Sequence, residues 1–238
     1  MSQSNKKILI SGCGFSYSGQ ERKTWVNILR SVGANIVDVG GPAVSNQWII
    51  NKTFTKLLED PTVDIVILQL TSIGKLDVEI NDERVEQLVE PDSLRNFTFQ
   101  GIWPSSHSEE HLSKQLYTQL LYSPQLETED LFCKIMLLTH WCITHNIKLI
   151  ILQAYDIPWT NQHVEQLRDI ILNLNDTLFS QYKCSPTYQY HDSTNSNAVP
   201  CIQYHCELAD LISRLIAPDL LDRIHKIQSY YSTKSHSK

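Results

Sequence analysis

Residues 6–19 read KKILISGCGFSYSG, and this stretch decides the fold. It opens with a short apolar run, Ile8-Leu9-Ile10, of the kind that forms a buried strand. The run ends at Gly12-Cys13-Gly14 and continues into serines. Glycines after a strand let the backbone approach a ligand closely, and the N–H groups of the next helix point toward it. We therefore expect an α/β protein with a functional loop here; a tight turn without chemistry is the alternative.

Apolar runs and amphipathic stretches alternate along the chain. This alternation predicts βαβ units and hence a three-layer α/β/α sandwich with a central parallel sheet. The run at 63–70, VDIVILQL, is typical of a strand buried on both faces. We expect strands at 7–11, 35–39, 63–70 and 147–153, and helices at 21–32, after a Ser45 cap, at 109–122, 128–145, 161–182 and 202–216, and from Pro218.

We expect one domain over residues 1–229, with an inserted, lid-like segment at about 76–130 and a disordered tail over 230–238. The inserted segment is polar and irregular, and loops of this length in compact domains usually have a function.

Composition narrows the classes of partner. The chain has 238 residues, of which 42% are hydrophobic and 19% charged, with a net charge of -6. A negative charge disfavours nucleic acid as a main partner, since phosphate contacts require a basic face. We find no signal peptide, no membrane span and no CxxC pair among the six cysteines, so we expect reduced thiols and a cytoplasmic protein. Self-association into a homo-oligomer stays open.

Four loops at strand or helix ends, at 12–18, 40–46, 71–75 and 195–205, resemble the four sequence blocks of the SGNH (GDSL-type) hydrolases. The first block looks most similar to that of divergent members from marine phages and other viruses. The resemblance implies a flavodoxin-like fold, a serine nucleophile, a histidine base and an oxyanion hole, with no metal or organic cofactor. It also implies a small-molecule or glycan ester as substrate, and the host cytoplasm as location if the protein is viral.

The first block fits the family pattern in two registers. One places the block on residues 12–16 and puts Gly14 at the nucleophile position. The other places it on residues 14–18 and makes Ser16 the nucleophile. We place Gly12, Cys13 and Gly14 in the expected oxyanion pocket. Cys13 is a further candidate nucleophile, although we favour its role as a small residue that fills the turn.

The other three blocks depart from the family pattern. Ala43 stands at the oxyanion glycine, where its backbone N–H is retained, and Asn46 follows closely behind it. In the third block Thr71 and Ser72 are candidate donors, as is Lys75, because the asparagine is absent. In the fourth, Val199 replaces the histidine. His205 corresponds to the histidine of a following Gly-His pair, so His205, or His191, is the candidate base.

Two functions therefore stay open. The first is an SGNH-like hydrolase of acyl or acetyl esters with Ser16 as nucleophile and His205 as base. The second is a catalytically inactive binding or structural module of a virus, because most of the block residues are replaced. A zinc site is disfavoured, since the metal-ligand types crowded at Cys184, His191, Cys201, His205 and Cys206 match no finger or ribbon spacing.

Overall fold

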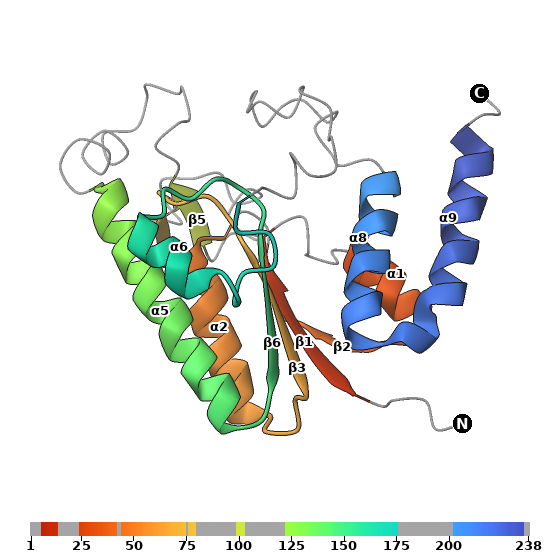
Figure 1. The fold of residues 1–238 in the computed structure, drawn as a ribbon, viewed down its shortest axis with the longest axis horizontal. Helices are drawn as coiled ribbons and strands as arrows, with labels where there is room; N and C mark the ends of the chain where they lie inside the picture. Colours follow the sequence, from red (N-terminus) through yellow and green to blue (C-terminus); the bar gives the residue numbers. More distant parts are fainter. Residues whose placement is uncertain are drawn as a thin grey trace, which may run out of the picture.

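A four-stranded parallel sheet forms the centre of the protein (Figure 1). The computed structural model describes residues 6–13, 24–41, 44–74, 76–79, 99–102, 122–175 and 202–235, with the backbone alone described at 76–79, 99–102, 202–204 and 230–235. The strands of the sheet are β1 (Lys7–Gly12), β2 (Asn35–Asp38), β3 (Ile65–Leu70) and β6 (Lys148–Gln153). Their spatial order is β2-β1-β3-β6, which is the flavodoxin-like order of doubly wound α/β proteins.

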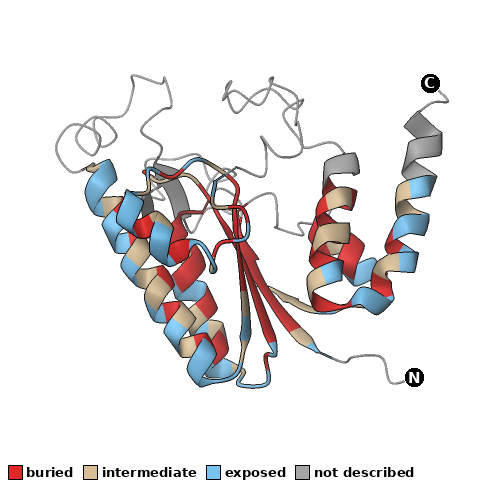
Figure 2. Cartoon of the chain, in the orientation of Figure 1, coloured by how far each residue is buried: buried red, intermediate tan, exposed pale blue. Residues whose placement is uncertain are grey.

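Helices cover both faces of the sheet, as predicted. In Figure 1, α1 (Trp25–Ser31), α8 (Ile202–Ile216) and α9 (Leu221–Ser235) lie on one side, and α2 (Asn46–Glu59), α5 (Pro124–Thr144) and α6 (Asn161–Leu167) lie on the other. Every residue of β3 is buried, and Figure 2 shows burial along the strands between the two helical layers. The prediction of a three-layer α/β/α sandwich is confirmed.

Polar side chains set where several helices begin. Thr24 accepts from the N–H of Asn27, so α1 begins at Trp25 and not at residue 21 as predicted, because Thr24 itself has extended backbone. Ser45 caps α2 as expected, by accepting from the N–H of Trp48.

The prediction that a helix starts after a Thr128 cap was wrong. Ser123 is the cap of α5, and Pro124 occupies its first turn, where a proline is well tolerated. Thr128 lies inside the helix and donates its hydroxyl to the carbonyl of Pro124. Residues 124–130, at the end of the predicted insertion, therefore belong to α5.

The predicted long helix at 161–182 was also wrong, since α6 ends at Leu167. Beyond it, Ile171 forms a parallel bridge with Ile151 of β6, and the N–H of Leu172 donates to the carbonyl of Ile151 at 2.9 Å. Pairing with the sheet edge replaces the next helical turns. The inserted segment contains an antiparallel pair, β4 (Leu76–Glu79) and β5 (Phe99–Ile102).

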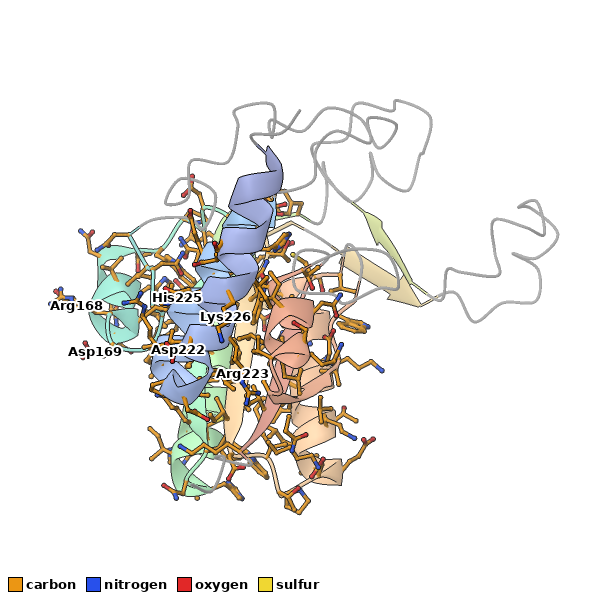
Figure 3. All side chains as sticks on the ribbon, turned by 90° about the vertical axis from the view of Figure 1, so that its right-hand side faces the viewer. Arg168, Asp169, Asp222, Arg223, His225 and Lys226 are labelled. Atoms are coloured by element: carbon orange, nitrogen blue, oxygen red, sulfur yellow. The ribbon has the colours of Figure 1, made fainter. Side chains whose placement is uncertain are left out.

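Residues 230–235 are helical, although they belong to the range 230–238 that was predicted to be a disordered tail. After a short 3-10 turn, η3 (Pro218–Leu220), α9 continues to Ser235, because residues 230–235 contain neither proline nor glycine to end it. Arg223, labelled on α9 in Figure 3, donates through Nη1 to the carbonyl of Val32 at 2.8 Å and so satisfies the C-terminal end of α1. Among the described residues, no helix combines the length and the apolar character needed to cross a membrane.

Candidate functional site

The carboxyl ends of β1 and β3 lie side by side at the point where the strand order reverses. Gly12 pairs with Gln69 in register, and β1 continues outward to β2 while β3 continues to β6. In open α/β sheets this switch point is where ligands bind. Of the residues predicted for the site, Gly12, Cys13, Asn46, Thr71 and Ser72 are described by the structure and belong to this edge. The predicted residues Gly14, Ser16, Ala43, Lys75 and His191 lie outside the described residues.

Close backbone contacts shape the β1 side of this edge. The N–H of Gly41 donates to the carbonyl of Gly12 at 3.1 Å. A side chain on Gly40 would begin 3.1 Å from that same carbonyl oxygen, and one on Gly41 would begin 2.8 Å from Val44. A side chain at Gly41 would therefore require Val44 to shift, and one at Gly40 would press against the end of β1.

Asn46 joins the first turn of α2 to the end of β3. Its Nδ2 donates to the carbonyl of Thr71 at 2.9 Å, and its Oδ1 accepts from the N–H of Thr71 at 2.7 Å. Asn46 thus pairs both the backbone N–H and the backbone carbonyl of Thr71. The Oγ1 of Thr71 is fully buried and has no hydrogen-bond partner within the part of the chain that the structure describes.

The segment after Thr71 is attached to α5. The backbone N–H of Gly74 donates to Oε2 of Glu127 at 2.6 Å. Gly74 has a φ of 82°, a left-handed conformation that favours glycine. A carboxylate from the first turn of α5 thereby holds the segment that follows β3.

His205 projects from α8 toward the start of α1. Its Nδ1 accepts from the backbone N–H of Trp25 at 3.2 Å, and the side chain is buried, with 3% exposed. Because a backbone N–H can only donate, the proton of the neutral imidazole lies on Nε2 in this arrangement. Burial lowers the pKa of His205 from 6.5 to about 4, since the charged ring would lose its hydration.

Gln69 is a polar residue of this edge that the sequence analysis missed. It is fully buried in β3; its Oε1 accepts from the indole Nε1 of Trp25 at 3.3 Å, and its Nε2 donates to the sulfur of Cys13 at 3.8 Å. An amide inside the apolar run VDIVILQL was the signal that could have revealed it, because buried amides in strands need specific partners. The structure thus places His205, Trp25 and Gln69 on the α1 side of the sheet and Asn46 on the α2 side.

The residues suspected of metal binding are mostly outside the described part of the chain. Cys184, His191 and Cys201 are among those, whereas His205 and Cys206 lie buried in α8. Within the described ranges, no three His, Cys, Asp or Glu side chains are grouped so as to hold a metal ion.

The fold and the site define a doubly wound α/β protein with its candidate site at the topological switch point. No model of a known protein family matches the sequence, and no curated protein matches it. Several solved structures do align with it. A protein grouped with the lipolytic G-D-S-L family from Desulfitobacterium hafniense DCB-2 shares 13% identity at a TM-score of 0.48, with 89% of this chain and 100% of that chain covered.

Two other solved structures give similar values. A GDSL-like lipase from Bacteroides thetaiotaomicron VPI-5482 is 10% identical at a TM-score of 0.45, with 90% of this chain and 89% of that chain covered. The psychrotrophic esterase EstA from Pseudoalteromonas sp., inhibited by monoethylphosphonate, is 12% identical at a TM-score of 0.44, with 95% and 99% covered.

Proposed function

We propose that the protein is an SGNH-like hydrolase of acyl or acetyl esters, with Ser16 as nucleophile and His205 as base. The observation that carries the proposal is the position of His205, whose ring lies against Trp25, the first residue of α1. Trp25 follows directly after Thr24, the first described residue beyond the range 14–23, which contains Ser16. The contact therefore places a histidine of α8 at the start of the helix that follows this range.

The proposed reaction follows from the chemistry of these groups. The Oγ of Ser16 attacks the ester carbonyl and its proton passes to the imidazole of His205, after which the alcohol leaves and water releases the acyl group. Backbone N–H groups of Gly14 and Ala43 are proposed to stabilise the oxyanion. Gly12, Cys13, Asn46, Thr71 and Ser72 are proposed to shape the pocket.

The hydrogen bond and the burial of His205 determine how it can act as a base. The ring is neutral at neutral pH and has its lone pair at Nδ1, so taking up a proton there requires release of the N–H of Trp25. Burial also makes the imidazolium unfavourable. We therefore expect a slow hydrolase whose rate falls with acidity near pH 4 and not near the ordinary histidine pKa of 6.5.

A small-molecule or glycan ester is the proposed substrate class. The cytoplasmic location, the viral setting and self-association stay predictions of the sequence.

The occupied Nδ1 of His205 favours a second candidate, a binding module without esterase chemistry. In that reading the hydrogen bond to Trp25 is structural, and the crevice at the switch point holds a ligand without cleaving it. The absence of an asparagine at 71–74 agrees with this reading, because the family takes an oxyanion donor from that residue.

Labelling with a fluorophosphonate probe separates the two candidates, because such probes react with activated serines and not with ordinary ones. The experiment compares the wild type with Ser16→Ala and with Ser18→Ala, a neighbouring serine of the same loop, as the matched control. The hydrolase predicts stoichiometric labelling that Ser16→Ala abolishes and Ser18→Ala retains. Folded wild-type protein that does not react would refute the hydrolase and favour the binding module.

A further inference from the structure

Four residues form a buried series of hydrogen bonds across the carboxyl edge of the sheet. The sulfur of Cys13 accepts from Nε2 of Gln69 at 3.8 Å, and Oε1 of Gln69 accepts from Nε1 of Trp25 at 3.3 Å. The backbone N–H of Trp25 donates to His205 at 3.2 Å. All four residues are at least 97% buried. Water does not compete for these buried groups, so each hydrogen bond is stronger here than the same bond would be at the protein surface.

Hydrogen-bonding chemistry determines the orientation of the Gln69 amide. The indole Nε1 of Trp25 is only a donor, so it must face the amide oxygen. The amide nitrogen then faces Cys13, whose sulfur can accept. A flipped amide would place two donors against each other at Trp25. Gln69 is therefore held in one orientation by the identity of its partners.

The two partners of Gln69 flank residues 14–23 of the chain. Cys13 is the last described residue of the β1 segment, and Trp25 is the first residue of α1. One amide on the neighbouring strand thus binds a residue just before 14–23 and a residue just after it. The register pairs Gly12 with Gln69, which brings the end of β1 to the level of this amide.

We propose that Gln69 is a positioning residue that fixes the separation of Cys13 and Trp25, which flank residues 14–23, and thereby the place of the nucleophile proposed in that range. The part that concerns the nucleophile rests on the proposed function, in which Ser16 reacts. The part that concerns the separation rests only on the contacts of Cys13 and Trp25. Gln69 acts through these two residues and is not proposed to touch the substrate.

The chain contains a matched control for this role in Gln153. It lies at the end of the adjacent strand β6, is 3% exposed, and accepts from the indole Nε1 of Trp159 at 2.8 Å. Its chemistry is the same as that of Gln69, but its partner belongs to the segment after β6. Replacing Gln153 removes a buried amide and an indole acceptor without touching Cys13 or Trp25.

The first experiment compares Gln69→Leu with Gln153→Leu by two measurements on Cys13 and Trp25. One is site-resolved alkylation of Cys13, with the exposed Cys133 as internal reference. The other is hydrogen exchange at the amide of Trp25. We expect Gln69→Leu to accelerate both by at least about tenfold, and Gln153→Leu to leave both within about twofold, because each lost hydrogen bond changes an opening equilibrium by several-fold. Equal rates in the two variants would overturn the proposal.

A conservative variant gives a readout that general destabilisation would not. In Gln69→Glu an ionised carboxylate still accepts from Trp25 but cannot donate to Cys13, whereas the protonated acid can do both. Protection of Cys13 in this variant should therefore recover as the pH falls, while Gln69→Leu stays unprotected at every pH. Lack of recovery in Gln69→Glu would contradict the assigned orientation of the amide.

The rate at which the fluorophosphonate probe labels the protein tests whether the positions of Cys13 and Trp25 affect the proposed nucleophile. We expect Gln69→Leu to react about tenfold or more slowly than Gln153→Leu, because small displacements of a nucleophile have large effects on rate. Failure of the wild type to react would refute the proposed hydrolase, and alkylation and exchange would still decide the role of Gln69. A rapid reaction of Gln69→Leu with Cys13 and Trp25 both opened would overturn the positioning of the nucleophile.

Discussion

Protonation of His205 should couple the stability of the protein to pH. The folded state lowers its pKa from 6.5 to about 4 through burial, so the unfolded chain binds a proton at this site more readily than the folded one. A group of this kind contributes stability that is fully present above pH 6.5 and is lost as the pH falls toward 4. Each pKa unit corresponds to about 1.4 kcal/mol, which gives a loss of about 3 kcal/mol over this window.

His205→Asn isolates this contribution. An asparagine oxygen stands near the position of Nδ1 and can accept from the N–H of Trp25, but it cannot be protonated in this range. We expect the free energy of unfolding of the wild type to fall relative to this variant by about 1.4 kcal/mol per pH unit between about pH 6 and 5. The difference should be constant above about pH 7.

Urea denaturation at a series of pH values, followed by far-ultraviolet circular dichroism, measures this difference. Other carboxylates and histidines titrate in both proteins, so their contributions cancel in the comparison. Parallel curves for the wild type and His205→Asn across this window would refute the reasoning. Such a result would mean that solvent reaches the ring and hydrates its charged form.

Two further substitutions test the polar contacts of the core. Asn46→Ala should lower the free energy of unfolding by about 2–4 kcal/mol, because it leaves the buried N–H and carbonyl of Thr71 unpaired; a loss under about 0.5 kcal/mol in urea denaturation would contradict this. Ser213→Ala should raise the melting temperature and add about 1 kcal/mol, because the Ser213 hydroxyl is fully buried without a partner among the described residues and alanine favours the helix; a fall in stability would show that the hydroxyl is bonded.

Local pattern predicted most of the sheet. Strand β3 was recognisable because a strand buried on both faces must be apolar nearly throughout, and the glycines after β1 marked the end of that strand. Helix α8 has the predicted bounds, since its apolar residues repeat with the helical period up to Ile216. The parallel arrangement followed from the alternation of these elements.

The predicted end of a helix was wrong where a contact with a distant residue outweighed the local helical preference. The amphipathic pattern after Asn161 continues past Leu167, but Ile171 pairs with β6 and ends the helical path. The tail after Ser229 was predicted to be disordered, whereas α9 extends to Ser235.

The sequence by itself determined the four strands of the central sheet and their parallel arrangement, because apolar period and glycine placement act between near neighbours. Only the tertiary structure decided which side chains meet at the edge of the sheet. Gln69 lies 56 positions from Cys13 and 44 from Trp25, and His205 lies 180 positions from Trp25. No local pattern encodes such pairings, since they arise when strand order and helix packing bring distant residues together. The sequence therefore shows Gln69 as the polar residue within the apolar run of β3, but only the tertiary structure shows its hydrogen-bond partners.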